Sequence, residues 1–214
     1  DEVYIMEEYV RGYVQTFDAI VDSKGQPLFE SGNISPKSIM DIVNDNSDSV
    51  YYLVKDVPDN IRSAGLRTIK AFGVRSRFIH LEFFVLTEDQ EGLGRKGDVL
   101  GLEVNMRPAG GYTPDMYNYS QETDVYKIWA DMVCYDKNTK PIGAHHFCAF
   151  YGRRDGNHYK LDDYEIRMKY VGNIVMSGRI PDALSGAMAN QMYVGRFDTE
   201  EELNAFYRDI SDRF

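Results

Sequence analysis

Alternation of apolar and polar residues along the chain predicts that much of it forms β-strands. Side chains of a strand point to opposite faces in turn, so a run with this period of two has one face suited to a core. The clearest run is YVQTFDAIVD at 13–22, which is followed by the turn SKGQ and a return strand. We expect strands at 3–8, 13–22, 27–31, 50–54, 78–86, 102–107, 144–151, 174–176 and 191–194.

A different spacing, with apolar residues three and four apart, predicts helices elsewhere. Thr199 followed by Glu202 is a capping-box pattern, in which each side chain bonds a backbone N–H of the other residue, and it marks the start of a last helix. Thr123 is a candidate N-cap and Gly73 a candidate stop. We expect helices at 58–72, 123–135 and from 199 onward, two shorter helices at 36–43 and 162–170, and a linker at 135–142.

The stretch LEVNMRPAGG at 102–111 reads as a short strand that breaks into a glycine-rich turn. Glu103, Asn105 and Arg107 share one face of this strand. A carboxylate and an amide oxygen are ligands suited to Mg²⁺, and a guanidinium suits phosphate. This face therefore predicts a site for a metal ion and ATP. The alternate positions are expected to point into a core: Leu102, Val104 and Met106.

A second strand strengthens this prediction. The run FIHLEFFVL at 78–86 is apolar except at His80 and Glu82, which share a face, and the polar segment 87–98 suits a hairpin connection. Folded back, Glu82 would lie beside Glu103. Two carboxylates at such a short distance raise each other's pKa unless a cation lies between them. The pair therefore favours a divalent metal ion. The alternative is two strands whose polar faces meet solvent.

The glycine-rich turn and the residues after it are candidate substrate contacts. Gly110 and Gly111 allow a backbone to approach an anion closely, although a turn after a strand explains them equally well. Asp115 is a candidate contact to the substrate, as is Asn118. Both residues also suit the start of a helix, where they would act as caps.

Other polar residues have simpler structural interpretations. His80 lies near the predicted metal ligands, but a packed histidine within a strand is the simpler interpretation. The adjacent His145 and His146 would face opposite ways on a strand, so they do not suit one metal ion. Arg153 and Arg154, beside an aspartate, are expected in a solvated loop.

Composition excludes several classes of partner. The chain has 214 residues, of which 43% are hydrophobic, and a formal net charge of −10. This acidic balance argues against nucleic acid and anionic membranes as partners, while a local cluster of cations can still bind a nucleotide. No apolar run approaches the roughly 18 residues of a membrane-spanning helix. The two cysteines form no CxxC motif, so a cytoplasmic location is expected.

The two strands FIHLEFFVL and LEVNMRPAGG together resemble the C-terminal lobe of the ATP-grasp superfamily, especially its carboxylate–amine ligases. In that family a Glu on one strand and a Glu-x-Asn on the next hold the metal ions that bridge the phosphates of ATP. The resemblance therefore implies ATP as the nucleotide, bound near Glu82 and Glu103. It implies Mg²⁺, with Mn²⁺ as an alternative, on Glu82, Glu103 and Asn105. It assigns Arg107 the catalytic role of stabilising phosphate or an acyl-phosphate intermediate.

The N-terminal segment YIMEEYVRG also looks like the hinge between the two lobes of the family. The resemblance implies that the backbone of Glu7, Glu8, Tyr9 and Val10 grips adenine and that an acidic side chain reaches the ribose. The segment YVQTFDAIVDSKGQP resembles the strand–turn–strand that follows this hinge. Residues 112–118 and 124–126 resemble the branch that contains amino-acid ligases and the large chain of carbamoyl-phosphate synthetase.

The resemblance implies an α+β fold. Residues 1–135 would form the ATP-grasp C-terminal subdomain, a mostly antiparallel sheet packed with helices. Residues 136–214 resemble nothing with an assignable role, and they would form a small α+β C-terminal extension that serves acceptor recognition or a dimer interface. The family's N-terminal lobe would precede Asp1, so we expect the chain to be a fragment that is inactive alone. Apolar surface left uncovered by that lobe would allow a homodimer.

The reaction implied by the resemblance is ATP-dependent activation of a carboxylate. The γ-phosphoryl group would move to a carboxylate oxygen to give an acyl phosphate and ADP, and an amine would then attack. The partners would be small-molecule carboxylate and amine substrates. Alternatives are a carbamoyl-phosphate synthetase-type enzyme, a biotin-carboxylase-type enzyme, whose acceptor-side residues find no match here, and a nucleotide-binding module without catalysis.

Overall fold

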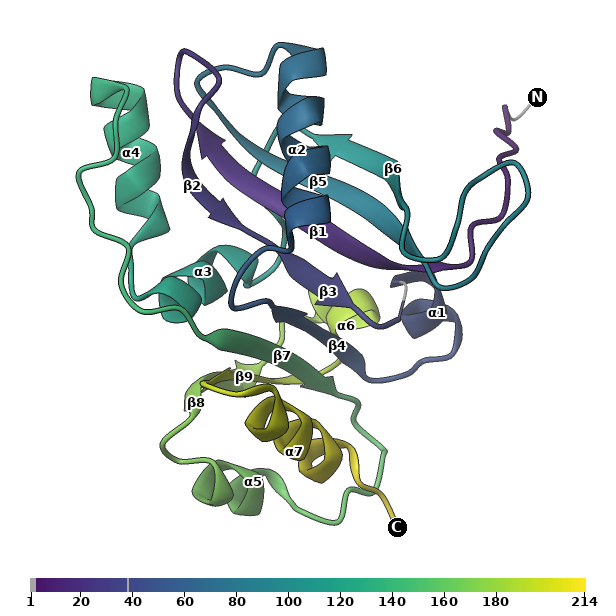
Figure 1. The fold of residues 1–214 in the computed structure, drawn as a ribbon. Helices are drawn as coiled ribbons and strands as arrows, with labels where there is room; N and C mark the ends of the chain where they lie inside the picture. The colour runs from purple at the N-terminus through teal and green to yellow at the C-terminus, as the bar shows by residue number, and fades with distance from the viewer. Residues whose placement is uncertain (1–2, 38) are drawn as a thin grey trace.

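One antiparallel sheet runs through the part of the protein that the computed structural model describes, residues 3–37 and 39–214 (Figure 1). Its nine strands follow the order β6-β5-β1-β3-β4-β7-β9-β8, and β2 pairs with β1 beside this path. Each of these pairings is antiparallel. The strands are β1 (Gly12–Val21), β2 (Pro27–Ser31), β3 (Asn33–Ser35), β4 (Ser49–Leu53), β5 (Arg77–Leu86), β6 (Val99–Asn105), β7 (Phe147–Arg153), β8 (Ile174–Arg179) and β9 (Gln191–Phe197).

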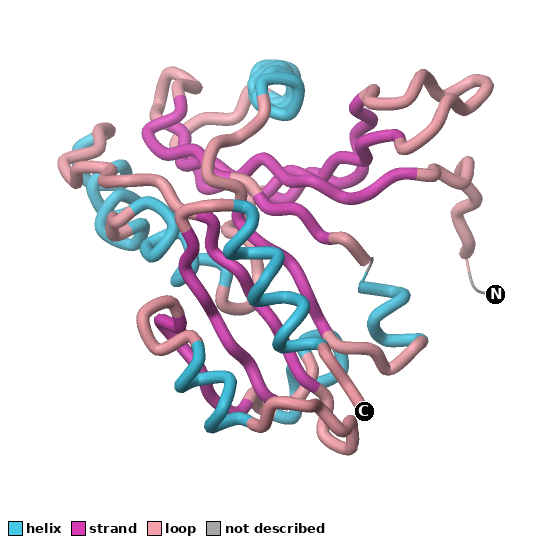
Figure 2. The backbone as a smooth tube through the Cα atoms, turned by 60° about the horizontal axis from the view of Figure 1, so that its bottom comes forward, coloured by secondary structure: helices cyan, strands magenta, loops and turns pink. Residues whose placement is uncertain are grey.

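Helices lie on both sides of this sheet (Figure 2). The long α2 crosses β1 and β5, whereas α7 packs against β7 and β9 at the other end of the sheet (Figure 1). The predicted α+β class is therefore confirmed. None of the helices in the described residues combines the length and apolar character needed to cross a membrane. The helices are α1 (Ile39–Asn44), α2 (Asp59–Phe72), α3 (Thr113–Gln121), α4 (Val125–Tyr135), α5 (Asp163–Lys169), α6 (Asp182–Met188) and α7 (Glu200–Ser211).

The helix ends follow the local sequence. Thr199 caps α7 in the predicted capping box with Glu202. Gly73 ends α2 with a φ of 61°, in the left-handed region that glycine tolerates best. The predicted cap of α4 is wrong by one residue, because the side chain of Asp124, not Thr123, accepts the N–H of Lys127 in the first turn of that helix.

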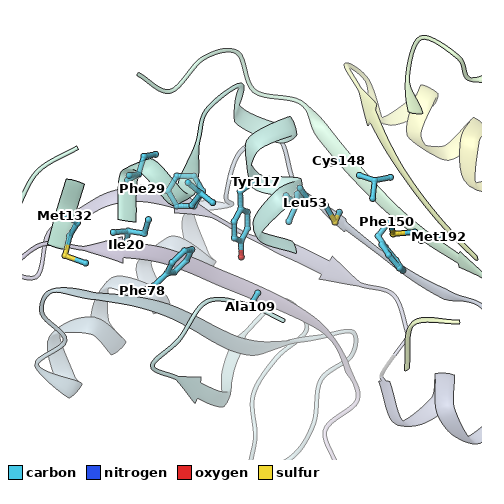
Figure 3. Packing of buried hydrophobic residues seen from close by; sticks show 14 of the residues in the cluster. Ile20, Phe29, Leu53, Phe78, Ala109, Tyr117, Met132, Cys148, Phe150 and Met192 are labelled. Carbon is cyan, nitrogen blue, oxygen red and sulfur yellow. The ribbon is translucent and has the colours of Figure 1, made fainter. Parts of the chain in front are cut away.

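Both faces of β1 are buried, and each packs into its own core. Phe17 on one face lies in a cluster under α2 with Ile61. Ile20 on the other face lies in a cluster that α3 and α4 cover. Figure 3 shows Tyr117 of α3 reaching into this second cluster, where its ring lies 5.4 Å from that of Phe29. Full burial on both faces makes β1 the structural centre of the N-terminal half.

The sheet continues from the N-terminal part of the chain into residues 136–214. β4 pairs with β7 along its whole length, with Tyr51 opposite Phe150, and the two rings stack 4.9 Å apart. The segment 136–146, which contains no helix or strand, leads from α4 to β7. The predicted linker therefore connects two parts that share one sheet.

The strand predicted at 3–8 is wrong. Residues 3–11 of the described chain form neither helix nor strand. Val3, Ile5 and Met6 are at least 86% exposed, so no described part of the chain covers their apolar side chains. An alternating pattern of apolar and polar residues does not form a strand when its backbone N–H and C=O groups have no neighbouring strand to bond.

Three elements were not predicted from the sequence: β3, α3 and α6. In α3 the buried apolar residues Met116 and Tyr117 are adjacent, and polar residues flank them on both sides. The buried apolar residues of this helix therefore do not recur three or four positions apart, the spacing that would predict it. α6 buries none of its residues, and at seven residues it is too short for its apolar positions to stand out in the sequence. β3 is only three residues long.

The solvated loop predicted for Arg153 and Arg154 is also wrong, because both residues are buried. Arg153 donates to the backbone carbonyl of Ile210, and its guanidinium lies 4.1 Å from the ring centre of Tyr159. Arg154 donates to the carbonyls of Ser47 and Gly186. A guanidinium has five donors, and here they tie together segments that are far apart in sequence.

Asp48, just before β4, is the buried acceptor at the centre of this region. Its carboxylate accepts hydrogen bonds from the hydroxyls of Tyr151 and Tyr159 at 2.8 and 2.7 Å. It also pairs with Arg213 at 2.7 Å and accepts the N–H of Arg154. Burial raises the pKa of Asp48, but these hydrogen bonds together outweigh burial and lower it below the usual value.

We expect Asp48→Asn to destabilise the fold by about 2–3 kcal/mol at pH 7, because a buried charge-assisted network loses its charge. A carboxylate with a lowered folded-state pKa contributes stability above its unfolded value of 3.8, and this contribution is lost as the pH falls further. The gap between variant and wild type should therefore close below pH 3.8. Urea unfolding between pH 7 and pH 3 measures it. Asp45→Asn, at an exposed neighbouring residue, is the control, and a gap that stays constant with pH contradicts the prediction.

Candidate functional site

The predicted metal ligands lie side by side on β5 and β6. The antiparallel register places Glu82 opposite Glu103 and His80 opposite Asn105. Directly opposite residues of a sheet bring their Cβ atoms to roughly 5 Å. A bulge follows Glu82, where the register shifts before Phe83. We call the surface formed by Glu82, Glu103 and Asn105 the metal face.

The outer side of β6 differs from the prediction. Leu102, Val104 and Met106 are between 36% and 43% exposed, so the expectation that they point into a core is wrong. β6 is the edge strand of the sheet, and α2 lies mainly over β1. Their apolar side chains are therefore open to solvent.

A histidine supplies the positive charge that the paired carboxylates need. The ring of His80 contacts Glu82 Oε1 through Nε2 at 3.1 Å and Asp18 Oδ1 through Nδ1 at 2.5 Å. Burial lowers the pKa of His80, but the charge of Asp18 and the hydrogen bonds to both carboxylates outweigh it and raise the pKa to about 10. His80 is therefore an imidazolium at neutral pH, held between two carboxylates.

The same contact explains the ionisation of Glu82. Hydrogen bonding to His80 holds the pKa of Glu82 below its usual range, against the effect of burial, and Glu103 and Arg107 lower it further. The mutual rise in pKa expected for two adjacent carboxylates is thus not found at Glu82. A cation already present in the protein keeps this carboxylate ionised and ready to act as a ligand.

Asp18 belongs to this cluster of ionisable groups, and sequence analysis did not find it. It lies at the middle of β1, directly opposite His80 on β5, and its side chain is fully buried. Thr16 donates its hydroxyl to Asp18 Oδ2 at 2.6 Å. Burial and the nearby Asp18 carboxylate raise the pKa of Tyr117, whose hydroxyl points toward the sheet (Figure 3). The available signal was a single acidic residue inside an otherwise apolar strand.

The glycine-rich turn after β6 lies next to this site. Arg107 is exposed, bonds the carbonyl of Pro108 at 2.9 Å and influences the charge of Glu82. A cavity of about 350 Å³ opens beside the turn, and its walls include Glu82, Gly110 and Gly111. Gly111 has a φ of +60°, a conformation that glycine adopts at little cost. A Cβ on Gly110 would meet open space.

The remaining predicted contacts lie farther from the cavity. Asp115 is outside its lining and accepts the hydroxyl of Tyr126 at 2.8 Å. Asn118 accepts the N–H of Val125 at the start of α4, so it acts as a cap, as one of its two interpretations expected. The role of Asp115 in substrate binding stays a prediction.

The segment with Glu7, Glu8, Tyr9 and Val10 lies beside the connection between β5 and β6 (Figure 1). The carbonyl of Tyr9 accepts a hydrogen bond from the side chain of Gln90 on this connection at 3.1 Å. Most of the segment is exposed, so its backbone is accessible to a ligand. Its predicted contact with adenine stays a prediction.

The donor set of the metal face fits a hard divalent cation. Asn105 carries a buried amide Nδ2 without a hydrogen-bond partner, which is unusual for a buried polar group. Because the O and N of an amide are assigned by their surroundings, a cation at the metal face would call for the oxygen to point there. Among the described residues no group of three or more His, Cys, Asp or Glu is arranged to hold a metal. The metal face is not such a group, because it consists of two carboxylates and one amide.

Comparisons with known proteins find a shared fold. No family model matches the sequence, and no curated protein matches it either. Solved structures do match. An L-amino acid ligase from Bacillus licheniformis has a TM-score of 0.66 at 15% identity, over 96% of this chain and 51% of that chain. A phosphoribosylglycinamide synthetase from Anaerococcus prevotii has a TM-score of 0.60 at 14% identity, over 94% of this chain and 53% of that one.

A third similar structure was solved with the nucleotide. It is a carboxyaminoimidazole ribonucleotide synthase from Aspergillus clavatus complexed with ATP, with a TM-score of 0.53 at 10% identity, over 94% of this chain and 50% of that chain. This chain thus spans about half the length of these proteins. The matches show that the chain has the fold found in ATP-grasp carboxylate–amine ligases.

We expect Asp18 and His80 to be strongly coupled in stability. Asp18→Asn and His80→Gln should each destabilise the fold by about 3 kcal/mol or more, because the first removes the fully buried partner of His80 and the second leaves the buried Asp18 carboxylate without a cation. The double variant should lose much less than the sum, with a coupling of about 2–3 kcal/mol. Urea unfolding of the four proteins measures this coupling.

The matched control is the exposed ion pair of Arg11 and Glu88, 2.6 Å apart. Its coupling should stay below about 1 kcal/mol. Additive effects of Asp18→Asn and His80→Gln would show that the buried contact has no energetic role.

Proposed function

We propose that this chain is the nucleotide- and metal-binding half of an ATP-dependent carboxylate–amine ligase. The proposal rests above all on the register of β5 and β6, which places Glu82 opposite Glu103 and leaves Asn105 on the same surface. The fold shared with ATP-grasp ligases gives this carboxylate pair a context in which metal-bound ATP is expected.

Glu82, Glu103 and Asn105 would hold Mg²⁺ or Mn²⁺. Oxygen ligands from two carboxylates and one amide suit these ions, which keep several water or phosphate oxygens in their coordination sphere. The ion would neutralise charge on the phosphates of ATP and orient them. His80 beneath Glu82 fixes the carboxylate orientation through the 3.1 Å contact, so the ligand is held in place before the nucleotide arrives.

The reaction would proceed in two steps. An oxygen of the substrate carboxylate attacks the γ-phosphorus, the bond to the β–γ bridging oxygen breaks, and ADP leaves. An amine nitrogen then attacks the acyl carbon, phosphate leaves with the C–O bond electrons, and the nitrogen loses a proton. Arg107 would stabilise negative charge on the transferred phosphoryl group. The glycine turn would let the substrate approach the backbone closely.

Adenine would lie against the backbone of Glu7 to Val10, a largely exposed segment without helix or strand beside the β5–β6 connection. The chain spans about half the length of the ligases that share its fold, so the other face of the nucleotide would be covered by an N-terminal lobe. Phosphoryl transfer depends on positioning and exclusion of water, and one lobe alone supplies neither fully.

Glu103→Gln should lower ADP release by about 100-fold or more, because a neutral amide holds Mg²⁺ poorly at the point where charge develops. The assay follows ADP formed from Mg-ATP with panels of carboxylates and amines, in the protein that carries this chain with its N-terminal lobe. Glu91→Gln, at an exposed residue of the β5–β6 connection, is the matched control and should keep full activity. Full activity of Glu103→Gln would refute the proposal. Nucleotide binding without ADP release from any pair would identify a non-catalytic binding module instead.

Residues 1–214 alone should release ADP no faster than the background hydrolysis of Mg-ATP. The physical reason is that half of the nucleotide would remain in water, where the phosphates keep their hydration. The same ADP assay measures this, with the two-lobed protein as the positive control. Robust ligation by the 214-residue chain would contradict this prediction.

A further inference from the structure

The cavity of about 350 Å³ beside the metal face has walls of two chemical kinds. Glu82, His80 and Thr16 line it together with the glycine turn. α6, Ile42 of α1 and Val50 of β4 line it as well, and Met188 of α6 reaches the glycine turn. A molecule that fills the cavity must therefore have a polar part and an apolar part.

α6 offers nothing to pair with a charge. Among the described lining residues the acidic or basic side chains are Lys37, which is exposed, and His80 and Glu82, which contact each other at 3.1 Å. α6 contributes only small or apolar side chains to the wall: Ala183, Leu184, Ala187 and Met188, with Gly186 between them. A charged group placed against α6 would lose hydration without gaining a partner from that helix.

Met188 limits the size of the cavity. Its Cε and Sδ lie 2.8 and 3.1 Å from the position that a Cβ on Gly111 would take, so its side chain rests directly on the glycine turn. The backbone around Met188 is tightly held. A Cβ at Gly152 would come within 2.1 Å of the Met188 carbonyl oxygen, and the next residue, Ala189, is buried with a φ of +69°. Such a conformation is costly for alanine and persists only where the surroundings fix it.

The volume of the cavity limits the size of the ligand. At about 30 Å³ for each water molecule, 350 Å³ holds roughly a dozen non-hydrogen atoms. That is enough for a carboxylate with a branched aliphatic side chain, and too little for a large bicyclic group.

We propose that this cavity selects a carboxylate substrate whose side chain is uncharged, apolar and about the size of that of leucine. Met188 and Leu184 set this selectivity. The orientation of the ligand, with its carboxylate toward the glycine turn, rests on the proposed ligase function. The binding preference itself does not, because the walls of the cavity come entirely from this chain.

Isothermal titration calorimetry of the 214-residue chain, without nucleotide, tests the preference with four probes. L-Leucine and 4-methylpentanoate should bind, whereas L-glutamate and L-lysine should bind about 100-fold more weakly or not at all. Equal affinity for the charged probes, or no binding of either apolar probe, overturns the inference. Binding of leucine by a chain whose two-lobed form releases no ADP would refute the ligase function and leave this inference standing.

Two variants of α6 locate the binding site. Met188→Phe should fill the cavity and weaken leucine binding at least 10-fold. Leu184→Lys, at a position that is 44% exposed and tolerates the change, should admit L-glutamate and raise its affinity at least 10-fold. Met168→Phe and Val171→Lys, at exposed positions outside the cavity lining, are the matched controls and should bind like wild type. Unchanged ligand preference in both α6 variants overturns the inference, and circular dichroism confirms that each variant folds.

Discussion

The fully buried carboxylate of Asp18 is the constraint on which the site depends. A buried charge is tolerated only when it is paired and hydrogen-bonded, and here His80 and Thr16 do both. The pairing requires one register between β1 and β5, in which Asp18 lies opposite His80. A slip of one residue would put Asp18 and His80 on opposite faces of the sheet and break the pair. The charge pair therefore fixes the alignment of β5, which carries Glu82, against β1.

That alignment determines the electrostatics of the surface above it. His80 is shared between Asp18 and Glu82, and Glu103 adds a third carboxylate next to them. His80 and Arg107 provide two positive charges against these three negative ones. The excess is negative and lies at the outer end of the cluster, near Glu103, where solvent has access. Such a gradient suits a cation that arrives together with an anionic ligand, because the inner carboxylate is already neutralised and the outer one is not.

Sequence analysis could predict the metal face because its information is local. Glu103, Asn105 and Arg107 share a face by the period of a strand, and a polar hairpin connection brings Glu82 beside them. The role of Asp18 depends on a pairing between strands about 60 residues apart, which alternation does not encode. Leu102 and its neighbours were placed in a core because an edge strand and a central strand show the same alternation.

The segment that resembled nothing in the sequence also builds part of the site. Pairing of β4 with β7 brings residues 147–153 beside the N-terminal strands, and the buried Arg154 that follows them bonds the carbonyls of Ser47 and Gly186. Arg154 thereby ties α6 to the chain before β4, and α6 forms the wall of the cavity that faces the glycine turn.

The burial of Arg154 could not be predicted from the sequence. Two arginines beside an aspartate give no sign of burial until the carbonyl groups that their guanidinium groups bond are known. The cavity thus takes Glu82 and His80 from β5 and its α6 wall from the second half of the chain. His80 holds Glu82 in place, and Arg154 ties α6 to the segment before β4. A single continuous sheet joins the two halves, so a local carboxylate motif lies beside a cavity wall that comes from a distant part of the chain.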